Sequence, residues 1–65
     1  MPTNLDELAR MIAHRDIISL NEAYTAIERT ADLLNEAIAA GSITMAEEIL
    51  LEELGIELDY LDLFL

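Results

Sequence analysis

The chain has 65 residues, of which 54% are hydrophobic, and its fourteen acidic residues face three arginines to give a formal net charge of −11. This charge disfavours binding to nucleic-acid phosphates and to anionic membranes, because like charges repel. The length allows at most one domain, over residues 1–65, and the absence of cysteine excludes disulfides and thiolate metal sites.

A first helix is predicted over residues 5–15. Asn4 is followed three residues later by Glu7, which is the spacing of a capping box. Leucine, alanine and isoleucine residues then recur at helical spacing. Ile17 and Ile18 fall outside this stripe, so we expect the helix to end at residues 14–16.

A second helix is predicted over residues 20–40. Ser19 and Glu22 have the spacing of another capping box, and Gly41 suits the left-handed conformation that ends many helices. One apolar stripe runs through the whole segment, as in a helix that covers a core. Beside it runs a second stripe of mostly small residues, which would let another backbone approach closely: Ala26, Thr30, Leu33 and Ala37.

A third helix is predicted over residues 45–54, because Thr44 and Glu47 repeat the capping-box spacing and Gly55 followed by Ile56 fits a Schellman-type end. Its apolar residues fall on two sides, with Leu50, Leu51 and Leu54 on one and Met45 and Ile49 on the other. A helix that is apolar on two sides lies centrally or is shared between subunits.

The C-terminal segment, residues 56–65, is apolar to its last residue. Ile56, Leu58 and Tyr60 alternate as in a strand, whereas Leu58, Leu61 and Leu65 fit helical turns, and periodicity alone does not decide between them. We favour a short helical turn that starts near Asp59. The predicted fold is therefore an all-α, small three-helix bundle in which the second and third helices form an antiparallel hairpin and the first packs across the second.

No catalytic, cofactor or metal site is predicted. His14 is the only histidine, and we interpret it as a surface residue near a helix C-terminus. Zinc requires more nitrogen or sulfur ligands than this chain offers. The glycines, Gly41 and Gly55, lie at helix ends and form no phosphate-binding loop. We therefore expect a protein that is not an enzyme.

The C-terminal third carries the residues that we predict to bind a partner. They are acidic, with no basic residue among them: Glu47, Glu48, Glu52, Glu53, Glu57, Asp59 and Asp62. We expect them to meet a basic protein surface, with Tyr60 or Phe64 as an apolar anchor. A charge that serves only solubility is the simpler interpretation.

Self-association is also predicted, as a homodimer or a higher oligomer, because a chain of this length has more apolar side chains than one small core hides. The residues expected at the interface are apolar and lie in the last two predicted helical segments: Met45, Ile49, Leu58, Leu61, Leu63 and Leu65. The tail has a second interpretation, in which it folds back and covers the core of its own chain.

These features predict a non-catalytic, acidic protein–protein interaction module that self-associates and docks on a partner protein. The alternative is an inhibitor that imitates nucleic acid towards a DNA- or RNA-binding protein. In size and acidity alone, the chain resembles small inhibitors that viruses and mobile elements encode. The N-terminal residues show neither the basic start nor the apolar run of a signal peptide, and no apolar run approaches about 18 residues. We therefore expect a cytoplasmic protein without membrane or direct nucleic-acid contact.

Overall fold

The computed structural model describes residues 1–65 and contains helices but no strand. The elements are α1 (Leu5–Asp16), α2 (Leu20–Ala39), α3 (Ile43–Ile49), the π-helical segment η1 (Leu50–Leu54) that continues α3, and the 3₁₀-helix η2 (Leu58–Phe64). The all-α class is confirmed. The short helical segment expected from near Asp59 is present as η2, which has 7 residues, so the structure has a fourth helix beside the three predicted ones.

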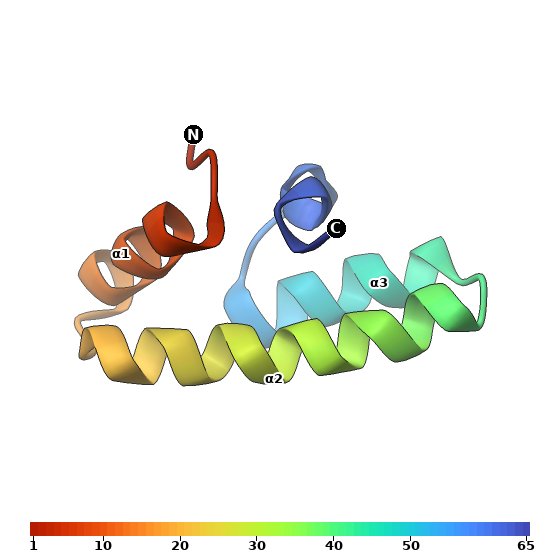
Figure 1. Cartoon of the computed structure of the whole chain (residues 1–65), viewed down its shortest axis with the longest axis horizontal. Helices are drawn as coiled ribbons and strands as arrows, with labels where there is room; N and C mark the ends of the chain where they lie inside the picture. The colour runs from red at the N-terminus through yellow and green to blue at the C-terminus, as the bar shows by residue number, and fades with distance from the viewer.

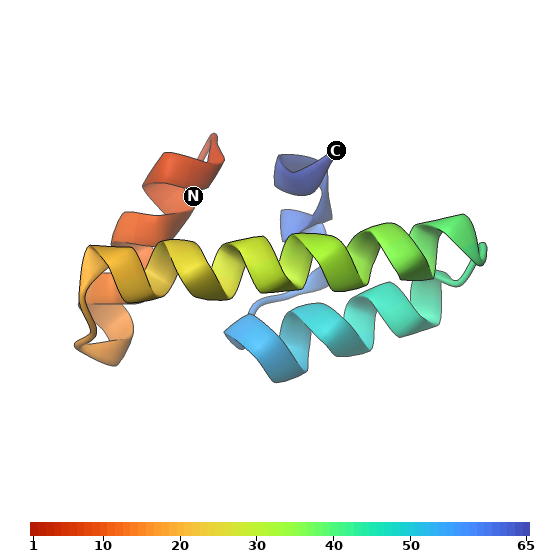
Figure 2. The same cartoon turned by 60° about the horizontal axis from the view of Figure 1, so that its bottom comes forward.

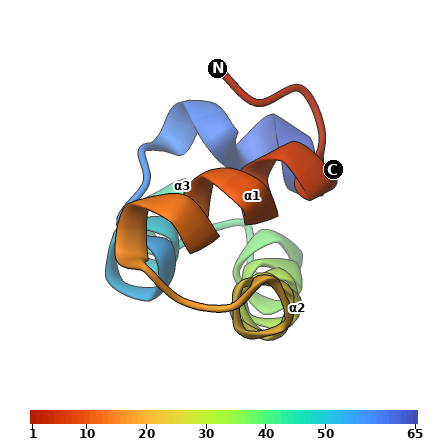
Figure 3. The ribbon, with the colours of Figure 1, turned by 90° about the vertical axis from the view of Figure 1, so that its left-hand side faces the viewer.

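The long helix α2 is the axis of the molecule and extends along its largest dimension of 32 Å (Figure 1). Helices α2 and α3 lie side by side and run in opposite directions, as predicted (Figure 2). Helices α1 and η2 lie on the same side of this hairpin (Figure 3), where α1 packs on α2 and η2 packs on α3 and η1. None of the helices is long and apolar enough to cross a lipid bilayer.

The first two helices begin at the predicted N-caps, but only Ser19 and Glu22 form the full capping box, because the Glu7 carboxylate accepts hydrogen bonds from Thr3 and not from Asn4. The side chain of Asn4 accepts a hydrogen bond of 2.8 Å from the backbone N–H of Glu7. Ser19 Oγ accepts from the backbone N–H of Glu22 at 3.0 Å, and the Glu22 carboxylate accepts from the N–H of Ser19 at 3.3 Å. These contacts satisfy backbone donors that have no partner within the helix.

The third helix begins at Ile43, two residues before the predicted start, so the prediction of Thr44 as its cap is wrong. Gly41, with φ +72°, closes α2 in the left-handed conformation, and the N–H of Ser42 donates to the carbonyl of Ala37 at 3.0 Å. Ser42 also serves as the next N-cap, because its Oγ accepts from the N–H of Met45 at 3.2 Å. The connection between α2 and α3 is therefore shorter than the capping-box pattern indicated.

The end of the third helix is as predicted at Gly55, which has φ +62°. Ile56 follows it, is only 4% exposed, and donates its N–H to the carbonyl of Leu50 at 3.2 Å.

Helix α1 ends differently. Ile17 adopts φ +55° although it is β-branched, and its side chain is 90% exposed. A β-branched residue in this conformation is strained.

The buried face of α3 and η1 is narrower than predicted. Ala46, Leu50 and Leu54 are buried at intervals of four residues, whereas Leu51 is 63% exposed. The prediction that Leu51 shares the side of Leu50 and Leu54 is therefore wrong. A π-helical turn contains more residues than an α-helical turn. Residues four positions apart therefore remain on the same face of the helix through η1.

The tail covers the core of its own chain. Leu61 is 9% exposed and belongs to the core cluster, and the half-buried side chains of η2 pack against that cluster. The core also contains one polar residue, Thr30, whose hydroxyl donates to the carbonyl of Ala26 at 2.8 Å. No buried side-chain polar atom lacks a hydrogen-bond partner, so the small core carries no desolvated, unpaired group.

Candidate functional site

A groove of about 390 Å³ lies between α2 and the continuous helix formed by α3 and η1. Its floor is apolar and consists of Leu33, Ala37, Ala40, Met45 and Ile49. Its rim is acidic and consists of Glu36, Glu48, Glu52 and Glu53. We call these nine residues the acidic groove.

Both walls of the acidic groove follow the same sequence pattern. On α2, Leu33 and Ala37 are separated by one helical turn with Glu36 beside them, and on α3, Met45 and Ile49 are separated in the same way with Glu48 beside them. Residues three and four positions apart share a helix face. Each wall therefore presents apolar residues inward and a carboxylate at the edge.

The electrostatic field of the acidic groove is uncompensated within the chain. None of the three arginines lines it. The only salt bridge joins Arg15 to Asp16 on α1, with 2.8 Å between Nε and the carboxylate. The resulting hydrogen bond lowers the pKa of Asp16 and raises that of Arg15. The rim carboxylates have no such partner, so the groove attracts positive charge.

The structure divides the predicted partner-binding acids between two surfaces. Glu48, Glu52 and Glu53 lie on the rim of the acidic groove. A second hollow, of about 460 Å³, opens between α3–η1 and the start of η2 and is lined by Glu47, Leu51, Ile56, Glu57, Leu58 and Asp59. Asp62 is exposed and lines neither surface. Adjacent residues on a helix point about 100° apart, so Glu47 and Glu48 face different ways.

The residues predicted for self-association are also separated. Met45 and Ile49 form part of the floor of the acidic groove. Leu61 is in the core, and Leu58 and Leu63 are half-buried against it, whereas Leu65 is 78% exposed. Most side chains of the tail therefore cover the core of their own chain, which agrees with the second interpretation of the tail.

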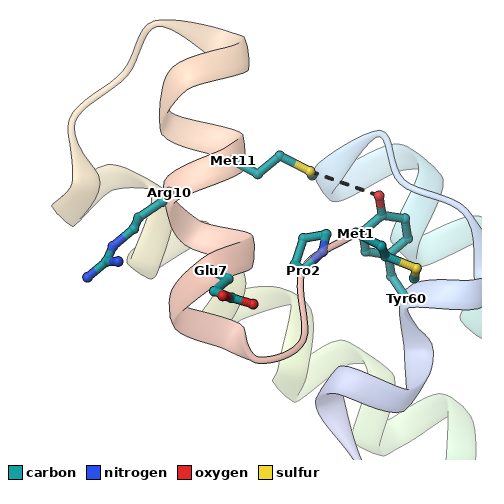
Figure 4. A pocket seen from close by; sticks show the side chains of 6 residues that line it. All are labelled: Met1, Pro2, Glu7, Arg10, Met11 and Tyr60. Carbon is teal, nitrogen blue, oxygen red and sulfur yellow. Dashed lines mark hydrogen bonds between the residues drawn. The ribbon is translucent and has the colours of Figure 1, made fainter.

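The two aromatic residues predicted as anchors pack within the chain. Tyr60 and Phe64 are half-buried against the core cluster. Figure 4 shows Tyr60 facing Met11, whose sulfur accepts a hydrogen bond of 3.9 Å from the Tyr60 hydroxyl. Their role in binding a partner stays a prediction.

A hollow of about 570 Å³ beside Tyr60 lies between the N-terminal residues, α1 and η2 (Figure 4). Glu7 and Arg10 both line it, although Arg10 points away from the methionine side chains. Hydrogen bonds from the side chain and backbone of Thr3 lower the pKa of Glu7. Because both charge signs are present, this larger hollow does not select the charge of a ligand.

The α2 wall of the acidic groove was not predicted as a site. The sequence does contain a signal for it, since Leu33 and Ala37 belong to the stripe of small residues on α2 along which α3 approaches. Glu36 and Ala40 carry no such signal, because their importance depends on what α3 brings opposite them. The predicted partner-binding residues all lie in the C-terminal third of the chain.

No group of three or more histidine, cysteine, aspartate or glutamate side chains is arranged to hold a metal ion. The chain matches no family model, and neither the curated proteins nor the solved structures contain a match to it.

Proposed function

We propose that this chain is a non-catalytic interaction module that docks on a partner protein with a basic surface. The observation that carries the proposal is the acidic groove, in which four glutamates surround an apolar floor with no arginine beside them. Apolar contact supplies affinity, and complementary charge supplies rapid association and the choice of partner.

The test is an affinity capture from the source cell with three forms of the protein. Glu48→Lys/Glu52→Lys changes the rim, and Glu28→Lys/Asp32→Lys makes the same change in net charge at exposed residues of α2 outside the acidic groove. The same basic protein should be retained by the native chain and by the control, and lost from the rim variant. Equal retention by all three forms would contradict the proposal.

Self-association forms a second part of the proposed function. Ile43 and Leu51 are 57% and 63% exposed and lie outside the acidic groove, and exposed large apolar residues favour association. Sedimentation equilibrium at about 50 µM, in the range of ordinary specific affinities, should show a dimer that Leu51→Gln weakens. A monomer at that concentration would contradict the proposal of self-association and leave the proposal of partner docking unaffected.

Imitation of nucleic acid is the alternative function. It is favoured by the single salt bridge of the structure, which leaves every acidic residue other than Asp16 without an ion pair. An imitator presents charge over a wide surface, so its binding falls steeply with salt. Its binding would also weaken by similar amounts in the rim variant and in the matched control, which separates it from docking in the acidic groove.

A further inference from the structure

We infer that the acidic groove takes one amphipathic, basic α-helix of a partner protein. This inference rests on the proposed function and deepens it by naming the structural element that is bound. The acidic groove is bounded by two antiparallel helices, and a third helix laid along them would extend the same side-by-side packing.

The length of the acidic groove sets the length of helix that it engages. Its α2 wall runs from Leu33 to Ala40, the C-cap residue that follows α2, which is roughly 10 Å at 1.5 Å per residue. Two turns of a bound helix fit this distance. The partner's apolar anchors are therefore expected at positions i, i+3 or i+4, and i+7, where they share one face.

The rim also sets where the partner's positive charges lie. One glutamate, Glu36, stands on the α2 side, whereas three stand on the opposite side: Glu48, Glu52 and Glu53. Lysine or arginine residues should therefore flank the apolar stripe of the bound helix on both sides, with the denser row towards α3 and η1. The long side chains of these residues reach a rim charge while their stems cover the apolar edge.

A second copy of this chain does not suit the acidic groove. Each copy carries a net charge of −11, and the chain has no lysine to place opposite the rim. Arg15 is already bound to Asp16 and to the carbonyl of Leu54, which leaves only Arg10 and Arg29 to face four rim glutamates. Two copies would therefore bring like charges together at the rim, which costs association free energy.

The test uses a fluorescein-labelled, 18-residue peptide with leucines at the predicted anchor positions and lysines on both flanks, measured by fluorescence anisotropy against the full chain. Two control peptides separate the contributions: a scrambled peptide of the same composition, and an oligolysine of the same charge. The helical peptide should bind at least tenfold more tightly than either control. The variants Glu48→Gln/Glu52→Gln and Met45→Ser should each weaken it about tenfold, whereas Glu28→Gln/Asp32→Asn should change it less than twofold.

Ala40→Trp gives an independent test, because Ala40 is exposed at the end of α2 and a large side chain there fills the acidic groove without removing a core contact. Its circular dichroism should match that of the native chain while peptide binding is lost.

Equal binding of the helical peptide and oligolysine would overturn the inference that a helix is bound, but it would leave the proposal of a basic partner protein unaffected. Displacement of the peptide by equimolar spermine would assign the groove to small polycations instead. No binding of any cationic peptide would contradict the proposed function as well.

Discussion

The guanidinium of Arg15 on α1 donates a hydrogen bond of 2.6 Å to the carbonyl oxygen of Leu54, the last residue of η1. A longer contact of 3.4 Å reaches the carbonyl of Gly55. Carbonyl groups at a helix end have no partner within the helix and favour a nearby positive charge. Asp16 holds the same guanidinium through two hydrogen bonds. Arg15 thus fastens α1 to the far end of the helix that lines the acidic groove.

Removal of this contact should destabilise the fold. We expect Arg15→Ala to lower the free energy of unfolding by about 1–2 kcal/mol, since the hydrogen bond involves a charged donor and a helix end. Urea unfolding followed by circular dichroism measures the change. Arg29→Ala is the matched control, because it removes the same charge from an exposed position on α2 and should change stability by less than about 0.5 kcal/mol. Equal effects of the two variants would mean that net charge, not the contact, is responsible.

Asp16 should give the stability a dependence on acid. Arg15 lowers the pKa of the Asp16 carboxyl in the folded chain, so the folded state favours the charged form more than the unfolded state does. The stabilisation is therefore complete above the unfolded pKa and disappears as the pH falls through the lowered, folded pKa.

Comparison with Asp16→Asn between pH 7 and pH 2 measures this effect. The native chain should be the more stable form by a constant amount well above about pH 4, the ordinary pKa of aspartate. This advantage should be lost progressively as the pH falls through the lowered pKa of Asp16. In an Arg15→Gln background the same substitution should show no such dependence. A pH-dependent difference that persists there would assign it to another partner.

The strained residue Ile17 offers a stabilising substitution. Its φ is +55° and its side chain is 90% exposed, so glycine or asparagine should relieve the strain without loss of packing. We expect Ile17→Gly to raise the free energy of unfolding by about 1 kcal/mol, the difference between the strain of a left-handed residue and the added freedom of the unfolded chain. Thermal unfolding is the measurement. The neighbouring change Ile18→Gly should destabilise, because Ile18 packs on the core.

Substitution of two adjacent leucines should have very different effects on stability. Leu50 is fully buried, and Leu51 is 63% exposed. Leu50→Ala should cost about 2–5 kcal/mol of stability through the cavity that it leaves, and Leu51→Ala should change stability by less than about 0.5 kcal/mol. Denaturant titration of both variants decides whether η1 has the orientation seen here. Similar costs for the two would reject it.

Local signals predicted the helices because caps act over three or four residues. Asn4 and Ser19 are the N-caps that their spacing indicates, although only Ser19 forms the complete capping box. The third start was misplaced because Ser42 needs no acidic residue three positions later to cap a helix, and the left-handed Gly41 puts it in position. The tail was expected to be helical from near Asp59, and η2 starts at Leu58, but periodicity alone did not exclude a strand, because the apolar residues fit more than one period.

Only part of the acidic groove could be predicted. Glu48 and Glu52 stand out as acids without a nearby base, and Met45 and Ile49 stand out as apolar residues away from the core stripe. The contribution of Glu36 depends on the pairing of α2 with α3. This pairing is a tertiary relationship, and a scan along one segment contains no information about which residue of another helix lies opposite.

The π-helical segment η1 has a consequence for how this chain should be aligned with others. A π-turn contains one residue more than the α-turn that would occupy its place, so Leu50–Leu54 accommodates a surplus residue. A chain that lacks one residue here can keep the same helix and return to α-helical hydrogen bonding. An alignment gap inside this helix would then be compatible with an unchanged fold, and the length of η1 would determine which carboxylates reach the rim.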